Sequence, residues 1–463
     1  MIKTLKQKIR TWLPRTGGAI DSWDGGHCRG WAIDSKKPNG IARVEVLLDG
    51  NVVDAVNATL SRPDLLQAGY KSGHHGFSVR IPDAVYLNPG LVCEVRVANA
   101  EVSLKNSKFT FGKNDKLPPE LINKISDEEL DERYLHSKLQ ASSMITSEAG
   151  TVRDDNKLIC LYAINSEKPA FYVKKTCEEL IKIGYSIVLI NSMESAPLHE
   201  SEYSQFSDMR IYKKDWGRDF ASWLCGYFHL EDKINSCDHV LFINDSVIGP
   251  LQPIQNIIDE YKKSNSDFWA LTDSYDQVYH YQSSVFILSN TGIKSRGWKL
   301  FVSTYDFPNE KIAVIRDGEL GLSQIMFSDG VRSSVMCPYE KLASTWWETA
   351  CDRNAALLSP SIASIKTVEP EYISWVQLWN DQVCKSIINR QPRNPQHTFW
   401  DTLLRDYKYP FIKKELYVFN PENVPNLILS VKLLPEDQRD NATEILKEFT
   451  KNNTGAPMAP PLY

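Results

Sequence analysis

The sequence lacks the patterns that mark several large classes of protein. Its nine cysteines are dispersed without a Cys-x-x-Cys pair, which argues against a disulfide framework and against a zinc knuckle. No run approaches the roughly 18–20 apolar residues that cross a bilayer. No Gly-x-Gly-x-x-Gly and no P-loop pattern occurs, so a dinucleotide-binding protein or a phosphotransferase is only weakly supported. These absences indicate a globular protein of a reducing compartment, and we expect a cytoplasmic location.

Basic residues do not outnumber acidic ones. The formal net charge is −5 over 463 residues, which gives no global basic field, and no nucleic-acid partner is expected. Apolar residues make up 42% and charged residues 24%, as in an ordinary globular protein. A chain of this length is expected to form two or three domains.

Acidic residues are absent before Asp21, and the segment over residues 1–16 has a pattern of its own. Its apolar residues fall on one helical face, and Lys and Arg residues supply charge. The pattern predicts a basic amphipathic helix, which can lie on an anionic membrane surface such as the cytoplasmic face of the inner membrane. The alternative is a helix that frays or packs locally. No apolar core of a secretory signal follows the basic residues. The apolar face consists of Ile2, Leu5, Ile9, Trp12 and Leu13.

Residues 17–112 alternate apolar and polar residues in short runs that Gly, Pro, Asn and Asp separate. Short alternating strands at this spacing predict an antiparallel β-sandwich, and Asp49-Gly50 predicts a tight hairpin. The segment shows no cluster of acids, bases or metal ligands, so we interpret it as an accessory domain for binding or scaffolding. Residues 113–155 are charged and helical in pattern, which is typical of a connector.

From residue 156 onward, predicted strands alternate with predicted helices. This order indicates an α/β domain over residues 156–345, with a mostly parallel sheet and helices on both faces. Residues 346–450 form a predicted helical extension that completes the domain. Its tryptophans indicate core packing, with an acceptor groove as the alternative. Residues 451–463 predict a disordered tail. The expected strands are 158–163, 186–190, 210–212, 239–243 and 268–271, and the expected helices are 170–183, 216–230 and 254–263.

Two polar motifs of the α/β domain are suited to chemistry. Asn244-Asp245-Ser246 follows a short apolar strand, and ligands bind at the carboxyl ends of strands in an α/β sheet. Gly217-Arg218-Asp219 begins an aromatic helix, where backbone donors and a cation can meet phosphate. The alternatives are an ordinary strand-to-loop turn for the first motif and a surface ion pair for the second. Their order and spacing favour a site for a diphosphate-bearing substrate.

In their order along the chain, these and later segments resemble the rhamnan synthesis F family of bacterial polysaccharide glycosyltransferases. The resemblance covers about residues 156–425, and seven short segments in one order carry it. The N-terminal module resembles, more weakly, the small β-domain that accompanies some bacterial glycosyltransferases. The segments are Gly-Arg-Asp-Phe at 217–220, Asn-Asp-Ser-x-x-Gly-Pro-Leu at 244–251, Phe-Trp-Ala-Leu-Thr-Asp-Ser at 268–274, His-Tyr-Gln-Ser at 280–283, Glu-Leu-Gly-Leu-Ser at 319–323, Asn-Pro at 394–395, and Trp400 followed by Pro-Phe-Ile-Lys-Lys-Glu-Leu at 410–416.

The resemblance implies a GT-A-like transferase that uses a nucleotide-activated sugar. In that fold an Asp-x-Asp element at the end of a central strand holds a divalent cation on the diphosphate. Asn244-Asp245-Ser246 stands at the expected place of this element with a single carboxylate. Asp245 is therefore the predicted ligand of an Mg²⁺ or Mn²⁺ cofactor, which one carboxylate, substrate phosphates and water can hold. The predicted donor-binding residues are Gly217, Arg218, Asp219, Asn244, Asp245, Ser246 and Asp273.

Glycosyl transfer also needs a base and an acceptor site. A positioned carboxylate must take the proton of the acceptor hydroxyl. By resemblance Glu319 is the predicted base, at the start of an apolar helix, and Asp317 is the alternative. The competing interpretation of Glu319 is an acid that complements a helix dipole. One base without a nucleophile indicates an inverting displacement. The predicted acceptor contacts are His280, Gln282, Lys413 and Lys414, the lysines being suited to the phosphate of a lipid-linked acceptor. The alternatives are a structural role for His280 and a solvated basic turn for the lysines.

The sequence thus predicts a glycosyltransferase that adds a sugar to a growing cell-surface polysaccharide or lipid-linked oligosaccharide. The name of the family implies rhamnose from dTDP-rhamnose, and another sugar from a UDP or GDP donor is the alternative among enzymes. A protein of another class stays open because Asn244-Asp245-Ser246 offers only one carboxylate. This would be a carbohydrate-binding or assembly subunit without catalysis.

Overall fold

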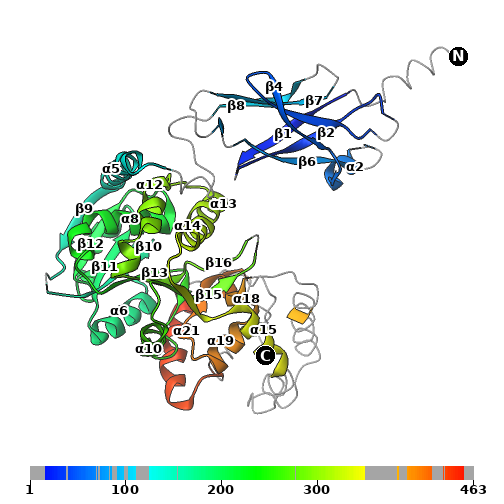
Figure 1. Ribbon diagram of the computed structural model, residues 1–463. Helices are drawn as coiled ribbons and strands as arrows, with labels where there is room; N and C mark the ends of the chain where they lie inside the picture. Colours follow the sequence, from blue (N-terminus) through cyan, green and yellow to red (C-terminus); the bar gives the residue numbers. More distant parts are fainter. Residues whose placement is uncertain are drawn as a thin grey trace. The chain divides into compact units, whose positions relative to one another are not determined.

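The computed structural model describes residues 16–110, 125–349, 383–384, 394–419 and 431–452, except 25, 38–39, 69, 71–72, 83, 86–90, 99–102, 154, 277 and 432. The chain divides into two compact units, Met1–Ile125 and Ser126–Tyr463, and each is described by itself (Figure 1). The predicted amphipathic helix lies outside the described residues except for residue 16. The predicted disordered tail also lies outside them, except that residues 451–452 end a helix.

The described part of the first unit contains eight strands and helix α2. The strands follow the order β4-β3-β7-β8-β1-β2-β6-β5 and pair antiparallel, except for a parallel pairing of Ala19 in β1 with Lys105 in β8. Both halves of this order share one core, to which β1, β2 and β6 contribute as well as β3 and β7. The single β1–β8 pair joins the halves into one eight-stranded order around this core, and the predicted β-sandwich stays a prediction. The bounds are β1 Gly17–Asp24, β2 His27–Ile33, β3 Arg43–Leu48, β4 Asn51–Asn57, β5 Leu60–Ser61, α2 Pro63–Gln67, β6 His74–Arg80, β7 Val92–Val97 and β8 Ser103–Thr110.

The turn Asp49-Gly50 joins β3 to β4. Leu48 pairs with Asn51, so the loop has two residues, and both residues have positive φ, 46° for Asp49 and 86° for Gly50. Asp-Gly adopts this left-handed geometry readily, and the geometry matches the twist of the flanking strands. The predicted tight hairpin is confirmed.

The second unit is built on a mixed sheet with the order β16-β15-β17-β13-β10-β11-β12-β9, and β18 lies beside β15. Strands β10, β11, β12 and β13 run parallel. Strands β9 and β17 run against them, and β15 and β18 run against β17. The α/β class predicted from the sequence is confirmed. The bounds are β9 Ile145–Gly150, β10 Leu158–Ile164, β11 Ser186–Asn191, β12 Met209–Lys213, β13 His239–Asn244, β15 Phe268–Ser274, β16 His280–Tyr281, β17 Val285–Ser289 and β18 Ser333–Cys337.

Helices cover both faces of this sheet (Figure 1). On one face, Trp223 of α8 packs edge-on against Phe242 of β13 with ring centroids 6.0 Å apart. On the other, α6, α10 and α21 enclose the side chains of Tyr162 and Leu241. Helix α6 ends at Gly184 in the left-handed conformation, as its sequence predicts. The bounds are α5 Asp127–Met144, α6 Phe171–Ile183, η1 Ala196–His199, α7 Glu200–Tyr203, α8 Arg218–His229, α9 Glu231–Ile234, β14 Val247–Ile248, α10 Gln255–Ser264, α11 Asn290–Ile293, α12 Arg296–Thr304, α13 Lys311–Val314, η2 Ile315–Leu320, α14 Gly321–Ser328, α15 Tyr339–Glu348, α18 Pro395–Thr398, α19 Trp400–Asp406, β19 Ile412–Lys413, α20 Lys414–Val418, η4 Glu436–Gln438 and α21 Arg439–Asn452.

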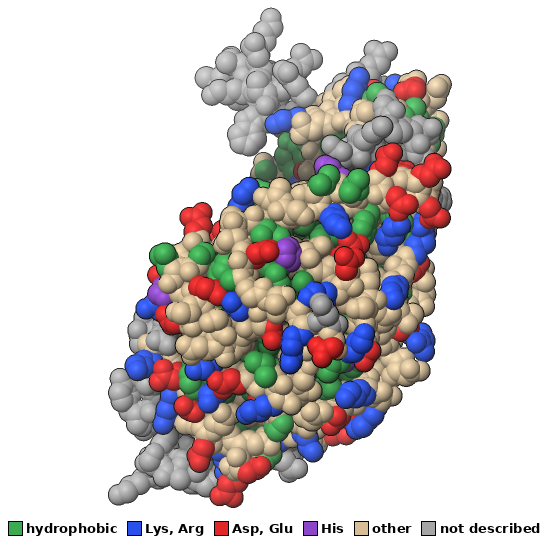
Figure 2. All heavy atoms as spheres, turned by 90° about the vertical axis from the view of Figure 1, so that its left-hand side faces the viewer, with side chains coloured by type: hydrophobic (Ala, Val, Ile, Leu, Met, Phe, Trp, Pro, Cys, Tyr) green, Lys and Arg blue, Asp and Glu red, His purple; other side chains and the backbone are tan. Residues whose placement is uncertain are grey.

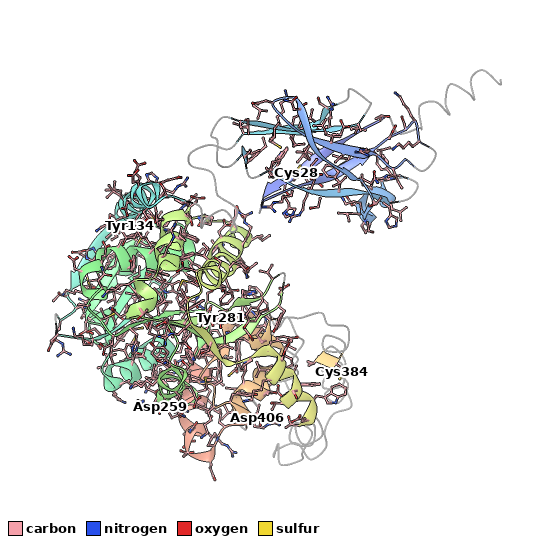
Figure 3. The ribbon with its side chains drawn as sticks, in the orientation of Figure 1. Cys28, Tyr134, Asp259, Tyr281, Cys384 and Asp406 are labelled. Carbon is pink, nitrogen blue, oxygen red and sulfur yellow. The ribbon has the colours of Figure 1, made fainter. Side chains whose placement is uncertain are left out.

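Helix α5 lies within the segment that the sequence predicts to be a connector, and it belongs to the second unit. Figure 3 labels Tyr134 on this helix. Its hydroxyl donates to Glu231 Oε1 at 2.5 Å, and its ring lies 5.3 Å from that of Phe228. Lys138 Nζ lies 2.5 Å from Glu231 Oε2. A solvated linker has no such contacts, so the packed unit begins before the predicted boundary at residue 156.

Tryptophans of the predicted C-terminal extension act mainly as core residues where they are described. Trp346 and Trp400 are buried, whereas Trp347 is exposed. Trp375 and Trp379 lie outside the described residues. On the face seen in Figure 2, acidic and basic side chains are interspersed over the second unit. None of the described helices is both long enough and apolar enough to span a bilayer.

Strand β13 lies in the packed core of the second unit. Phe242 is fully buried and stacks on Phe286 with ring centroids 4.5 Å apart. Truncation of a buried Phe to Ala removes apolar contact and leaves a cavity, so Phe242→Ala should lower the free energy of unfolding by about 3–5 kcal/mol. Denaturant titration followed by circular dichroism measures this. Leu198→Ala, at a side chain that is 82% exposed, is the control and should change stability by less than about 0.5 kcal/mol. Equal effects would contradict this account of the core.

Candidate functional site

The carboxyl end of β13 carries a hydrogen-bonded polar turn. Asn244 Nδ2 donates to Asp219 Oδ2 at 2.8 Å, which joins this turn to the start of α8. Asn244 Oδ1 accepts from the Ser246 amide at 3.1 Å and from Ser246 Oγ at 2.5 Å. The structure therefore brings the two polar motifs of the sequence together. Asn244 is buried, while Asp245 and Ser246 keep part of their surface exposed.

A strained backbone begins α8. Gly217 has φ 75°, and a Cβ atom at this position would lie 2.4 Å from Ala221 Cβ. Arg218 also has positive φ, 52°, a conformation that costs a residue with a side chain about 1–3 kcal/mol. Asn309 holds both residues, because its side chain accepts from the Gly217 amide at 3.2 Å and its carbonyl accepts from Arg218 Nε at 3.0 Å. The strain places Asp219 beside Asn244 and leaves the Arg218 side chain exposed.

Lys413 and Lys414 lie in this same cluster. Strand β19 pairs antiparallel with β14, with Val247 opposite Lys413. Lys413 Nζ donates to Ser246 Oγ at 2.9 Å, and Lys414 Nζ lies 3.4 Å from Asp245 Oδ2. The sequence predicts acceptor contacts for both lysines, whereas the structure groups them with the predicted donor residues.

The charges of this cluster act on one another. Loss of hydration and then repulsion from Asp245 raise the pKa of Asp219 to about 6, against the attraction of Lys413 and Arg218. Burial lowers the pKa of Lys413, while Glu319, Glu415 and Asp219 oppose this shift. The charges of Glu319, Glu415 and Asp219 therefore all act on Lys413.

Glu319 lies inside a continuous helical stretch, and the prediction that it begins a helix is wrong. Helix α13, the π-helical turn η2 and helix α14 follow one another from Lys311 to Ser328, and Glu319 belongs to η2. Such turns widen the helix locally and occur often at functional sites. A dipole-complementing acid at a helix N-terminus is therefore excluded as the explanation of this residue.

Hydrogen bonds keep the Glu319 carboxylate ionised. Its Oε2 accepts from the Ser283 amide at 2.8 Å and from Ser283 Oγ at 2.5 Å, and its Oε1 lies 3.4 Å from His280 Nε2. Burial alone would raise the pKa of Glu319, but the bonds from His280 and Ser283 outweigh it and lower the pKa below 4.5. Ser283 is part of the family segment 280–283, yet the sequence interpretation assigned it no role.

His280 is oriented by its other ring nitrogen. Nδ1 lies 2.8 Å from the Val278 carbonyl, which can only accept, so Nδ1 carries a proton. If Nε2 were unprotonated, its lone pair would face the Glu319 carboxylate. Burial opposes the charge of His280, but Glu319 outweighs it and the pKa of His280 is raised above 6.5. His280 and Glu319 therefore form an ion pair, and His280 positions the carboxylate.

The remaining predicted residues are engaged within the fold. Asp273 Oδ1 accepts from the Tyr339 amide at 2.5 Å at the start of α15, and its Oδ2 accepts from the Tyr279 hydroxyl at 3.0 Å. Gln282 Oε1 accepts from Thr272 Oγ1 at 3.0 Å.

Asp317, the alternative base, lies on the same π-helical turn as Glu319. Its Oδ1 pairs with Arg316 Nε at 2.7 Å, and its side chain is 8% exposed, compared with 18% for Glu319. Glu319 is therefore the more accessible carboxylate of the two.

The residues around Asp245 do not fit a divalent-cation site. Among the described residues, the cation that pairs with this carboxylate is Lys414, and Asp219 of the same cluster is hydrogen-bonded to Asn244. Within the ranges that the structure describes, no group of three or more His, Cys, Asp or Glu side chains could hold a metal ion.

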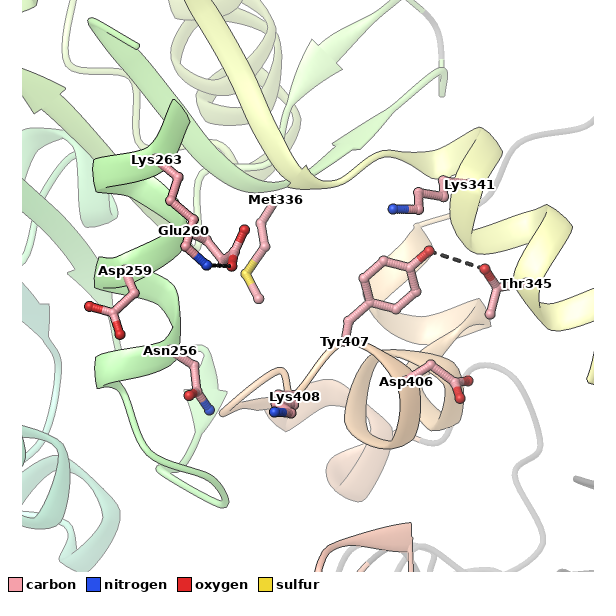
Figure 4. A pocket seen from close by; sticks show the side chains of 10 residues that line it. All are labelled: Asn256, Asp259, Glu260, Lys263, Met336, Lys341, Thr345, Asp406, Tyr407 and Lys408. Carbon is pink, nitrogen blue, oxygen red and sulfur yellow. Dashed lines mark hydrogen bonds and ion pairs between the residues drawn. The ribbon is translucent and has the colours of Figure 1, made fainter. Parts of the chain in front are cut away.

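A separate pocket of about 540 Å³ lies between α10, β18, α15 and the end of α19 (Figure 4). Its wall includes a Lys263–Glu260 ion pair at 2.7 Å and the Tyr407 hydroxyl, which bonds Thr345 Oγ1 at 3.1 Å. Its lining contains none of the predicted site residues. The candidate site is therefore the polar cluster at the end of β13 together with Glu319.

Comparisons with known proteins agree with the resemblance read from the motifs. The family model of rhamnan synthesis protein F matches residues 187–366, which include the segments from Gly217 to Ser323. The resemblance is thereby confirmed, although the segments at 394–416 lie beyond the matched range. The chain is similar to the virulence protein VirA of Vibrio anguillarum, with 28% identity over 303 residues that make up 64% of this chain and 90% of VirA.

Two further similarities are more distant. The uncharacterised protein y4gN of Sinorhizobium fredii is 21% identical over 188 residues, 40% of this chain and 49% of y4gN. Among solved structures, the mannosyltransferase Ktr4p from S. cerevisiae is 9% identical. The match covers 48% of this chain and 84% of that one, with a TM-score of 0.23. A TM-score this low carries no argument about fold or function.

The raised pKa of Asp219 predicts a stability cost at neutral pH. The pKa rises from 3.8 to about 6, so the cost is absent below pH 3.8 and fully present above pH 6. Asp219→Asn removes the charge and keeps an acceptor for Asn244, so it should raise the free energy of unfolding at pH 8 by up to about 3 kcal/mol. Denaturant titrations at pH 5 and pH 8 measure the effect, with Asp232→Asn on α9, an exposed position, as the control. A destabilised Asp219→Asn at pH 8 would contradict the burial of an unfavourable charge.

Proposed function

We propose that this protein is a glycosyltransferase with a GT-A-like site, which moves a sugar from a nucleotide donor to a saccharide acceptor. The observation that carries the proposal is the polar turn at the carboxyl end of β13, where Asn244 Nδ2 donates to Asp219 and Lys413 Nζ donates to Ser246 Oγ. This is where an α/β sheet binds ligands. The match to rhamnan synthesis protein F supports the same reaction class.

The proposed donor is a nucleotide diphosphate sugar. Asp219, Asn244, Asp245 and Ser246 offer polar groups at the partly exposed turn, and Arg218 stands exposed at the start of α8. The name of the matched family favours rhamnose, and hence dTDP-rhamnose, as the sugar and donor. The proposed acceptor is a growing cell-surface polysaccharide or a lipid-linked oligosaccharide. Contact with the inner membrane through residues 1–16 is part of this proposal.

Glu319 is the proposed base of an inverting displacement. The acceptor hydroxyl oxygen forms a bond to the anomeric carbon, the bond from that carbon to the diphosphate oxygen breaks, and the hydroxyl proton passes to Glu319. The diphosphate leaves with the electron pair of the broken bond. A carboxylate that is ionised at neutral pH can accept this proton without prior deprotonation.

Replacing the base should separate chemistry from binding. Glu319→Gln keeps the size of the side chain but cannot take a proton, so we expect transfer from dTDP-rhamnose to fall by about 10²–10⁴-fold. Chromatography of the released dTDP measures transfer, and calorimetric titration of dTDP should remain within about threefold of wild type. Asp317→Asn is the matched variant of the alternative base and should retain most activity. The reverse result would move the base role to Asp317. Unchanged polysaccharide synthesis in cells that carry Glu319→Gln and Asp245→Asn together would favour the non-catalytic subunit.

His280 should set the acid limit of the reaction. Because His280 lowers the pKa of Glu319, His280→Gln should raise this pKa and shift the acid limb of kcat/KM upward by about one pH unit. Rates measured between pH 4 and pH 9 test the shift, and Ile312→Ala on α13, at a side chain that is 80% exposed, serves as control. A uniform loss of rate without a shift would assign His280 a structural role only.

A further inference from the structure

Two lysines surround the single carboxylate that stands where a GT-A-like site has its metal ligands. We propose that Lys413 and Lys414 neutralise the donor diphosphate in place of a divalent cation, so that donor binding does not require a metal. This inference rests on the proposed function and names the charge partner within the same site.

The two ammonium groups lie at the polar turn that follows β13. The β14–β19 pairing fixes Lys413 beside the polar turn, since Val247 lies opposite Lys413 and the Lys414 amide donates to the Ser246 carbonyl at 2.8 Å. Both Nζ atoms then reach the turn itself, Lys413 at Ser246 Oγ and Lys414 at Asp245 Oδ2. A backbone pairing holds two cations at the end of β13, where a ligand would enter.

The side chain of Lys414 is available to a ligand. It is 32% exposed, and both contacts of its Nζ atom with Asp245 are long, 3.4 Å to Oδ2 and 3.3 Å to the carbonyl oxygen. The Tyr172 ring lies beside Lys414, with its centroid 5.8 Å from Nζ. The Tyr172 hydroxyl donates to the Asp245 carbonyl at 3.2 Å. A diphosphate oxygen can replace Asp245 as a partner of this ammonium without movement of the backbone.

Lys413 is also suited to an anion. An ammonium group has three N–H donors, and only the bond to Ser246 Oγ is seen among the described residues. Glu319, Glu415 and Asp219 favour its charged form although it is partly buried. A charge in such a partly desolvated place acts more strongly on a developing negative charge than it would in water.

The same groups disfavour a divalent cation. An ion bound to Asp245 would lie beside the Lys414 ammonium and near Lys413, and both would repel it. Hard cations need carboxylate and other oxygen ligands, but Asp219 Oδ2 already accepts from Asn244, and the Asn244 side-chain oxygen already accepts from Ser246. Asp219 Oδ2 and Asn244 Oδ1 are thus already engaged in hydrogen bonds within the cluster.

In the reaction, the two lysines stabilise the negative charge of the departing diphosphate. When the bond from the anomeric carbon to the diphosphate oxygen breaks, the electron pair stays on that oxygen, and Lys413 and Lys414 stabilise it as positive charges. No proton is transferred to the leaving group, and no co-reactant is needed.

Calorimetric titration of the full-length chain tests the proposal. Wild-type protein is titrated with dTDP, UDP, GDP and inorganic pyrophosphate, each in EDTA and in MgCl₂ or MnCl₂. We expect the Kd of the best nucleotide to agree within about threefold between EDTA and metal, and pyrophosphate to compete for the same site. Lys414→Gln should weaken binding at least about tenfold, whereas Lys414→Arg, which keeps the charge, should stay within about threefold.

Controls separate the lysines from general effects. Lys182→Gln, at an exposed lysine in the last turn of α6, which leads into the amino end of β11, should leave Kd unchanged. Thermal unfolding monitors folding, and Lys413→Arg is compared with Lys413→Gln because Lys413 is partly buried. Activity of the EDTA-treated protein is measured alongside binding.

The outcomes are distinct. Tight binding in EDTA that Lys414→Gln loses supports the proposal. Binding that EDTA abolishes and Mg²⁺ or Mn²⁺ restores overturns the lysine assignment but leaves the transferase proposal standing. Metal-independent binding that both lysine variants retain also overturns the assignment. If no nucleotide binds in either condition, the proposed function itself fails.

Discussion

The hydrogen bond between Asn244 and Asp219 is the interaction on which the geometry of the site depends. Strand β13 is buried along its whole length. The polar residues at its end therefore need hydrogen-bond partners within the protein, whereas water would supply them in a solvated loop. Asn244 meets this need on both sides of its amide, through Asp219 of α8 and through Ser246 of the following turn. Ser246 in turn contacts Lys413 of β19. Three segments that are distant in the sequence are thereby fixed around one strand end.

This arrangement includes two energetically unfavourable features. Arg218 holds a left-handed backbone conformation and Asp219 holds a carboxylate beside Asp245, with its pKa raised to about 6. Neither feature stabilises the fold. Backbone strain and an unfavourable charge occur together here, although the surrounding core is well packed. Such a combination is typical of a functional site. The same contrast separates Glu319, which is accessible on a π-helical turn, from Asp273, which serves the start of α15.

Local chemistry made much of the fold predictable. Asp49-Gly50 encodes its hairpin, Gly184 ends α6, and the alternation of apolar runs with helical patterns indicates the α/β sheet. Because ligands bind at the carboxyl ends of strands in an α/β sheet, the site was predicted at Asn244-Asp245-Ser246. The pairing of β14 with β19 was not predictable, because no local pattern records which distant two-residue strand will meet Val247-Ile248.

The position of Glu319 was missed for a different reason. Asp317-Gly318 before an apolar run resembles a helix start, but Gly318 instead permits close packing on Phe220. A Cβ atom at this position would lie 2.5 Å from the Phe220 ring. A close approach between two elements is a tertiary property, and the glycine that allows it looks in the sequence like a helix signal.

Lys413 links the two ends of the site. Its charge acts on Asp219 at the polar turn, and the charge of Glu319 acts on Lys413. In the proposed reaction, a bound diphosphate would add negative charge beside Lys413 and reduce the positive potential at Glu319. The pKa of Glu319 would then rise from its lowered value, since nearby negative charge disfavours an ionised carboxylate. A base with a higher pKa accepts a proton more readily. Donor binding would therefore make Glu319 a stronger base once the leaving group is in place. Until then, the ion pair with His280 would keep Glu319 ionised.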